Sequence, residues 1–172
     1  MSGDDPDSER RAFEALWEAQ YPAILAYARR RFDEEDARDI AAETFLVAWR
    51  RRKDLPDRET TPWLYGVARR VAADRHRAIA RAGRLSVRLA NERPGAERAV
   101  DPEGARRLLA ALGELSEGDR ELLLLTAWEG LTPAQAAVAL SCSPATVRVR
   151  LHRARARLRR LLSSAEESAA SA

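Results

Sequence analysis

The chain has 172 residues, of which 45% are hydrophobic and 33% charged, and its formal net charge is +3. This composition supports a folded core and excludes a chain that is disordered throughout. No apolar run approaches the roughly 20 residues that span a bilayer, the N-terminus is acidic and polar, and the single cysteine, Cys142, excludes an internal disulfide framework. We therefore expect a cytoplasmic protein with no direct membrane insertion.

Charge alternates in blocks along the chain. Residues 1–49 hold 6 basic and 12 acidic groups, whereas residues 50–93 hold 13 basic and 5 acidic groups. Residues 94–143 are acidic again, with 4 basic and 8 acidic groups, and residues 144–172 have 7 basic and 2 acidic groups. The basic blocks are candidates for phosphate binding, and the acidic blocks are candidates for binding a basic protein partner.

Apolar residues recur at helical spacing and no run alternates as a strand would, so the predicted fold class is all-α. A first apolar stripe begins at Phe13 and continues after Pro22, a residue suited to the first turn of a new helix. The acidic run 33–36 suits the positive end of a helix dipole and predicts a second helix there. Its expected buried stripe comprises Ala37, Ile40, Ala41, Thr44, Phe45, Ala48 and Trp49.

A polar loop over 50–60 separates this helix from a third one. Thr61 is the expected N-cap of the third helix, and Pro62 is its expected first residue. The three helices predict a compact domain over 10–81, preceded by a disordered tail over 1–9.

Helical periodicity then fails over 82–102, where glycine and proline recur, so a flexible linker is expected there. A second helical domain is predicted over 103–162, with a disordered tail over 163–172. Ser116 is expected to cap one of its helices, which ends at Gly130.

The two last predicted helices repeat one device. Thr132-Pro133 caps a short helix, and after the turn 141–143, Ser143-Pro144 caps a longer one. A short helix, a three-residue turn and a longer basic helix form a helix-turn-helix pattern, so the overall expectation is two small helical domains of which the second is a helix-turn-helix.

The last helix carries the strongest functional signal, because residues 144–162 contain seven arginines and no acidic residue. Small side chains at its start allow the backbone to approach base edges, and arginines can reach guanine acceptors or phosphates. This pattern favours DNA binding. A basic amphipathic helix that lies on a membrane or on a partner is the alternative.

The first domain carries two weaker signals. Asp36, Asp39 and Glu43 are spaced as neighbours on one helix, which suits either a partner surface or simple solubility and local ion pairing. Aromatic residues lie near the loop over 50–60, here called the basic loop because it begins with Arg50, Arg51, Arg52 and Lys53, and they could stack on single-stranded bases. A tryptophan at helical spacing is more often part of the core, which is where we expect Trp49. The aromatic residues concerned are Trp49, Trp63 and Tyr65.

Three segments, in order, resemble extracytoplasmic-function (ECF) sigma factors. Residues 36–49 (DARDIAAETFLVAW) resemble the signature helix of that family, and residues 62–69 (PWLYGVAR) resemble the start of its promoter-reading helix. Residues 146–155 (TVRVRLHRAR) are similar to its second recognition helix.

The resemblance implies a dissociable subunit of bacterial RNA polymerase that directs the core enzyme to promoter DNA and helps to open it. It implies core-polymerase binding by Asp36, Asp39 and Glu43. It implies binding of the minus-ten promoter element by Arg50, Arg51, Arg52, Lys53, Trp63, Arg69, Arg70 and Asp74. It implies binding of the minus-thirty-five element by Thr132, Ala145, Thr146, Arg148, Val149, His152, Arg153 and Arg155. Many members have an anti-sigma factor, so the resemblance implies such a partner here.

The sequence departs from the family pattern at three positions: Ala42 stands where glutamine is usual, Arg70 where asparagine is usual, and Ser141 where glycine is common. A stand-alone helix-turn-helix regulator is the alternative function. The sequence shows no catalytic constellation, small-molecule site or cofactor site. A metal site is not expected either, because His76 and His152 have no neighbours at ligand spacing. We therefore expect no enzymatic activity and no cofactor, and an inert Cys142.

Overall fold

The computed structural model describes residues 6–56, 58–81 and 101–170, with the side chains of 165–170 left aside. All regular structure in these residues is helical, which confirms the predicted fold class. Two compact units divide the chain, Met1–Arg88 and Leu89–Ala172, and the division falls within the predicted linker. Most of that linker lies outside the described residues.

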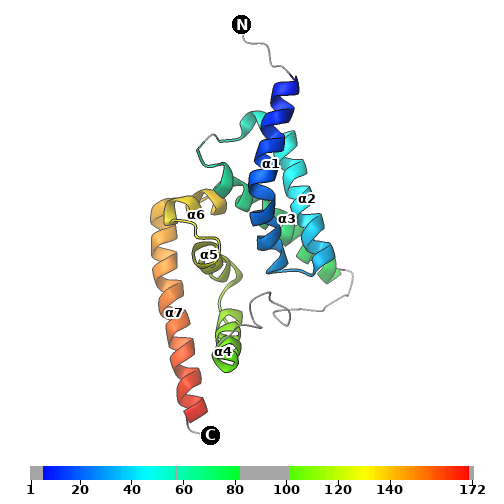
Figure 1. Ribbon diagram of the computed structural model, residues 1–172. Helices are drawn as coiled ribbons and strands as arrows, with labels where there is room; N and C mark the ends of the chain where they lie inside the picture. Colours follow the sequence, from blue (N-terminus) through cyan, green and yellow to red (C-terminus); the bar gives the residue numbers. More distant parts are fainter. Residues whose placement is uncertain (1–5, 57, 82–100, 171–172) are drawn as a thin grey trace. The chain divides into compact units, whose positions relative to one another are not determined.

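The first unit contains α1 (Pro6–Arg29), α2 (Glu34–Arg50), the short 3-10 helix η1 (Arg52–Asp54) and α3 (Thr60–Arg81). Each of its three α-helices packs against the other two (Figure 1). The predicted stripe of α2 forms the centre of this unit, since Ala37, Ile40 and Phe45 are at most 1% exposed. Burial of an isoleucine or phenylalanine side chain contributes about 1.5–3 kcal/mol, so Ile40 and Phe45 are substantial sources of stability in the unit.

Aromatic rings close one side of this core. Phe45 lies against Trp17, with ring centroids 4.6 Å apart, and Phe13 meets Trp49 edge-on at 5.0 Å. Trp49 is half-buried rather than enclosed. Its core contacts agree with the expectation for this residue, and its remaining surface faces the basic loop.

Helix α1 differs from its prediction in where it begins and in its continuity at Pro22. It begins at Pro6, inside the predicted N-terminal tail, and runs without a break through Pro22 to Arg29. A proline removes only one helical hydrogen bond, and the aromatic packing of Phe13, Trp17 and Tyr21 on α2 holds both halves on one axis. Pro22 therefore does not start a new helix.

The start of α2 follows the prediction, whereas that of α3 does not. The Asp33 carboxylate caps α2 by accepting a hydrogen bond from the Asp36 backbone N–H at 3.0 Å. Helix α3 already begins at Thr60, and the Thr61 hydroxyl donates to the Gln20 side chain of α1 at 3.0 Å instead of capping. A tertiary partner has thus replaced the local capping role that the sequence suggested.

The second unit contains α4 (Pro102–Gly113), α5 (Glu117–Ala127), α6 (Pro133–Leu140) and α7 (Pro144–Ala170). Helix α7 packs against the other three. It continues to Ala170, past the predicted end at 162. The segment after Ser163 is rich in alanine and glutamate, which are strong helix formers, and it contains no glycine or proline to stop the helix.

Two arginines tie the second unit together through bonds that the sequence pattern did not predict. Arg120 of α5 donates to the carbonyl oxygens of Leu112, Gly113 and Leu115, at 2.8, 2.9 and 3.2 Å, and so satisfies the end of α4. Ser116 caps α5 as expected. The Asp119 carboxylate of α5 forms an ion pair with the Arg150 guanidinium of α7, at 3.1 Å between oxygen and nitrogen.

Candidate nucleic-acid interface

The helix-turn-helix of the second unit is built from local caps. Thr132 and Gln135 form a reciprocal capping box at the start of α6: the Thr132 hydroxyl accepts from the Gln135 backbone N–H, and the Gln135 side chain accepts from the Thr132 backbone N–H at 2.9 Å. The predicted DNA contact Thr132 is thus exposed and also holds the helix start. Its hydroxyl oxygen is already used to cap α6.

The turn between α6 and α7 depends on a left-handed residue. Ser141 has a φ of 53° and a ψ of 45°, the conformation that glycine adopts without a steric penalty. Ser143 then caps α7, because its hydroxyl oxygen accepts from the Thr146 backbone N–H at 3.1 Å. The chain therefore enters α7 at an angle fixed by hydrogen bonds on both sides of the turn.

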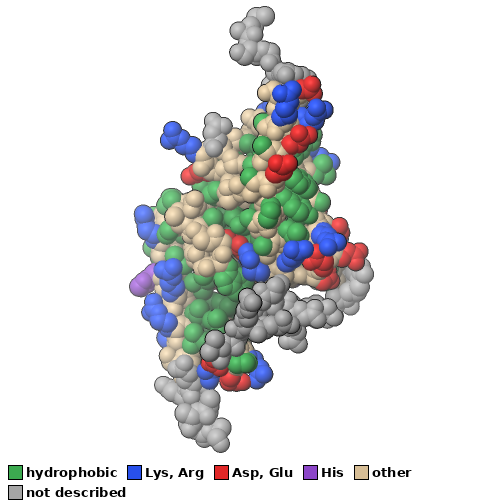
Figure 2. Space-filling model, in the orientation of Figure 1, with side chains coloured by type: hydrophobic (Ala, Val, Ile, Leu, Met, Phe, Trp, Pro, Cys, Tyr) green, Lys and Arg blue, Asp and Glu red, His purple; other side chains and the backbone are tan. Residues whose placement is uncertain are grey.

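Helix α7 has a buried face and an exposed basic face. Val147, Leu151 and Ala154 are at most 5% exposed and pack into the unit. The predicted DNA-binding residues of α7 all lie on its exposed surface: Ala145, Thr146, Arg148, Val149, His152, Arg153 and Arg155. The space-filling view shows basic side chains along the length of this helix (Figure 2).

The arginines of α7 differ in how far they are engaged. Arg150 is held by Asp119, and Arg157 donates to the Glu114 carbonyl oxygen at 3.2 Å. Within the described residues, Arg148 and Arg155 form no ion pair or hydrogen bond through their side chains. The structure thus separates arginines that bind the unit's own helices from arginines whose charge faces solvent, a separation that residue type alone did not reveal.

The basic loop of the first unit is divided in the same way. Arg50 and Arg51 are exposed. Arg52 donates through Nε to the Glu9 carboxylate of α1 at 2.6 Å, and its guanidinium lies over the Trp49 ring, 4.5 Å from the centroid. Lys53 Nζ lies 3.7 Å from the other oxygen of the same carboxylate.

Helix α3 brings further arginines near this loop. The pKa of Arg70 is lowered, first by partial desolvation and then by the charges of Arg69 and Arg51. Arginine remains protonated at any physiological pH, so this shift reports a charge that is partly buried and lies close to other positive charges. Arg69 Nε is buried and has no hydrogen-bond partner within the described part of the chain. Such a surface favours an anion.

The other predicted residues of α3 are less available. Trp63 is half-buried against the core cluster, and Tyr65 is 4% exposed with its ring 5.7 Å from that of Tyr27. Tyr65 is therefore a core residue and cannot stack on a base. Asp74 is exposed and pairs with Arg77 on the same helix.

The three acidic residues of α2 that were predicted to bind core polymerase separate into two kinds. Asp36 accepts from Arg75 Nε of α3 at 2.7 Å, and only 16% of its side chain is exposed. This hydrogen bond raises the pKa of Arg75 despite some desolvation. Asp39 is 63% exposed with Arg75 at 3.5 Å, and Glu43 is exposed.

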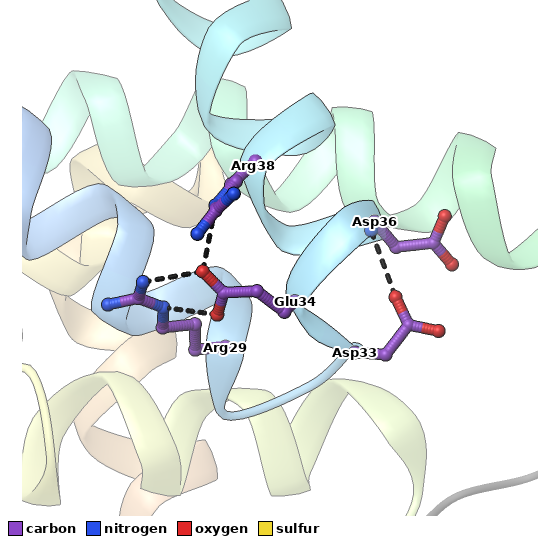
Figure 3. Close-up of polar contacts among 5 residues, drawn as sticks. All are labelled: Arg29, Asp33, Glu34, Asp36 and Arg38. Atoms are coloured by element: carbon purple, nitrogen blue, oxygen red, sulfur yellow. Dashed lines mark hydrogen bonds and ion pairs between the residues drawn. The ribbon is translucent and has the colours of Figure 1, made fainter.

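A second ion-pair cluster joins the end of α1 to the start of α2 (Figure 3). Arg29 binds both carboxylate oxygens of Glu34, at 2.6 and 2.7 Å, and Arg38 donates to the same carboxylate at 2.8 Å. The hydrogen bond from Arg29 holds the pKa of Glu34 below its ordinary value, and that bond raises the pKa of Arg29. All three side chains are solvent-exposed.

Two further features of the described residues bear on function. Within residues 6–56, 58–81 and 101–170, no helix is long and apolar enough to cross a membrane. The same residues contain no cluster of three or more histidine, cysteine, aspartate or glutamate side chains that could hold a metal ion. The His76 ring packs against Phe32, with centroids 4.6 Å apart.

Comparisons with known proteins cover both units. Residues 16–82 match the family Sigma-70 region 2, and residues 105–158 match Sigma-70, region 4. The chain is 34% identical to the RNA polymerase sigma factor CnrH of Cupriavidus metallidurans, over 92% of this chain and 90% of CnrH. It is 30% identical to the ECF RNA polymerase sigma factor SigD of Mycobacterium tuberculosis, over 88% of this chain and 77% of SigD.

A solved structure extends the likeness to three dimensions. The structure of CnrH in complex with the cytosolic domain of CnrY matches with a TM-score of 0.63 and 32% identity, over 90% of each chain. The matched ranges include the helix-turn-helix and also the acidic helix and the basic loop, and a stand-alone regulator would leave the last two unexplained. The chain therefore belongs to the RNA polymerase sigma factors of the ECF type, which bind core polymerase and direct it to promoter DNA.

Proposed function

We propose that the two units divide promoter recognition between them, with α7 as the reader of the minus-thirty-five element. The observation that carries this assignment is the exposed N-terminal half of α7, where small side chains at Ala145 and Thr146 stand beside unengaged Arg148. A backbone that can approach base edges and a guanidinium that can reach guanine acceptors are what major-groove recognition requires. Arg153 and Arg155 follow along the exposed surface and suit phosphate contacts.

In this proposal the basic loop and α3 bind the minus-ten element. Arg50 and Arg51 are exposed, and Arg69 and Arg70 add charge from α3. Trp49 lies under the Arg52 guanidinium and Trp63 packs against the core cluster, and both are half-buried, so each offers only part of its ring to a base. Binding here is therefore expected to depend more on the arginines and phosphates than on aromatic stacking.

The acidic face of α2 is the proposed contact with core polymerase, through Asp39 and Glu43. Charge reversal of both residues, D39R/E43R, should reduce the affinity for core enzyme while circular dichroism remains unchanged. The matched control is E18R, because Glu18 is an exposed acid on α1 outside this face. An unchanged affinity of D39R/E43R in a pull-down with purified core enzyme would overturn the assignment.

The protein acts, in this proposal, in the cytoplasm and has no catalytic activity of its own, because the polymerase carries out RNA synthesis. An anti-sigma factor is a further proposed partner. Its support is the likeness to CnrH, whose structure was solved with the cytosolic domain of CnrY.

Run-off transcription with purified core polymerase on a promoter library tests the main assignment. Arg148→Ala should weaken selection of the upstream element by about 1–3 kcal/mol if the guanidinium binds guanine. The control is Arg106→Ala, which removes an exposed arginine of α4 that already pairs with Glu103. Equal promoter selection by the wild type and Arg148→Ala would reject the role of Arg148, and failure of the wild type to initiate at any defined site would reject the whole proposal.

The loop assignment needs a separate template. R50A/R51A should impair initiation on closed duplex DNA and spare initiation on a template that is already melted around the start site, because the loop acts at strand opening. Equal impairment on both templates would contradict this role. Arg10→Ala, an exposed arginine of α1, serves as the control for loss of positive charge.

A further inference from the structure

A carboxylate of α1, that of Glu9, binds two of the positively charged side chains of the basic loop, Arg52 and Lys53. Glu9 receives Arg52 Nε on one oxygen at 2.6 Å and faces Lys53 Nζ with the other at 3.7 Å. Glu9 is separated from Arg52 by 43 residues in the sequence, and its side chain is 22% exposed. It is thus a tertiary contact between the first turn of α1 and η1.

Glu9 lies outside the part of the chain that matches the family, because the Sigma-70 region 2 match begins at residue 16. The loop residues that it binds lie inside that match. The family resemblance therefore offers no role for Glu9, and its contact has to be interpreted from its chemistry.

The chemistry is that of a phosphate substitute. A carboxylate presents two anionic oxygens to a guanidinium and an ammonium group, as a phosphodiester does. The Glu9 carboxylate and a DNA phosphate could not bind Arg52 and Lys53 at the same time, since a second anion in the same place would be repelled by the first. Two further basic residues at the start of the loop, Arg50 and Arg51, form no ion pair within the described residues.

Glu9 is not required to position Arg52. The Arg52 guanidinium also lies over the Trp49 ring and donates to the Trp49 carbonyl oxygen at 3.3 Å. These contacts hold the side chain against α2 whether or not its outer edge binds an anion. Removing the carboxylate would therefore leave an ordered cation that can receive another anion.

We propose that Glu9 is an internal competitor of DNA, which holds Arg52 and Lys53 until a backbone phosphate of the minus-ten strand replaces its carboxylate. This inference rests on the proposed DNA-binding role of the basic loop and adds a means of regulation to it. The competition lowers the affinity of the free protein for DNA. A DNA phosphate replaces the Glu9 carboxylate only where the DNA is held close to the loop.

Fluorescence anisotropy of the full chain with a labelled single-stranded 12-nucleotide oligothymidylate tests the competition. Glu9→Gln keeps the side-chain size and removes its charge, and it should bind the oligonucleotide about 3- to 10-fold more tightly than the wild type. The matched control is Glu14→Gln, because Glu14 is an exposed acid on the same helix that pairs with Arg10 at 3.6 Å. An equal gain in both variants would show a general charge effect and overturn the proposal.

A double-variant cycle separates this mechanism from the loop's own role. In the Arg52→Ala background, Glu9→Gln should lose most of its gain, whereas an unchanged gain would overturn the proposal. Unchanged or weaker binding by Glu9→Gln, with thermal melting showing an intact fold, would also overturn it. If instead R50A/R51A has no effect on oligonucleotide binding, the DNA-binding role of the loop fails, whatever Glu9 does.

Discussion

At the scale of single residues, the same side-chain type performs different tasks within one turn of helix. Asp36 and Asp39 are neighbours on α2, and residue type and spacing give no reason to assign them different roles. In the structure, Asp36 is turned to Arg75 and is mostly covered, whereas Asp39 remains mostly exposed. Burial and a tertiary partner decide between these roles, and neither can be read from local sequence.

This difference predicts unequal effects on stability. Asp36→Ala should lower the free energy of unfolding of the first unit by about 1–2 kcal/mol, because Arg75 loses a charge-assisted hydrogen bond at a half-covered site. Asp39→Ala should change it by less than about 0.5 kcal/mol. Urea unfolding followed by circular dichroism measures both values. An equal loss in the two variants would contradict the distinction.

Ser141 permits a second prediction at this scale. Its left-handed conformation costs an ordinary residue free energy that glycine does not incur, so Ser141→Gly should stabilise the second unit by about 1 kcal/mol. Ser143→Gly is the comparison, and it should destabilise the unit because it removes the hydroxyl that caps α7. Thermal unfolding of the full chain measures both changes; a lower melting temperature for Ser141→Gly would contradict the argument.

At the scale of helices, local patterns predicted interiors better than ends. The buried stripe of α2 and the Thr132 cap of α6 follow from spacing and residue type, and both are present. The continuous α1, the early start of α3 and the long α7 were missed. In each case a proline, a threonine or a polar composition indicated a boundary, while packing or helix propensity favoured continuation.

The candidate site was predictable in outline for a related reason. An uninterrupted set of arginines on one helix indicates a DNA-binding surface, since charge of one sign is unusual on a merely solvated face. The engagement of Arg52 by Glu9 and of Arg150 by Asp119 was not predictable, because each pair joins residues that are far apart in the sequence. Tertiary ion pairs depend on the packing of whole helices.

The α1–α2 junction gives a prediction for pH. Because Arg29 lowers the pKa of Glu34 in the folded state, the ionised carboxylate contributes stability above the ordinary value of 4.5. That contribution is lost as the pH falls through the lower, folded-state pKa. The difference in unfolding free energy between the wild type and Glu34→Gln should therefore be constant at neutral pH and disappear under acidic conditions.

Urea titrations between neutral and acidic pH measure this difference. Glu18→Gln is the control, because it removes an exposed acid of α1 that lies outside this ion-pair cluster. A difference between the wild type and Glu34→Gln that grows as the pH falls would reverse the sign and refute the assigned cause.

At the scale of the whole molecule, the central property is that two helical units share one chain. Each has its own core: α2 and its neighbours in the first, and α7 against the other three helices in the second. Each also has its own exposed basic surface. Two surfaces on one chain can bind two stretches of DNA more strongly than either alone, because the first contact raises the effective concentration of the second unit.

Cutting the chain between the units should therefore separate folding from function. A protease site inserted within residues 82–100 and cleaved after purification should leave helicity and both melting transitions unchanged, since each core lies within one piece. Promoter-specific transcription at nanomolar protein should fall about 100-fold or more, because the loss of linkage removes the effective-concentration advantage. The first piece should still bind core polymerase through Asp39 and Glu43 and compete with the intact protein. The uncleaved insertion variant controls for the added residues, and equal transcription before and after cleavage would show that polymerase and DNA hold the two units without their covalent connection.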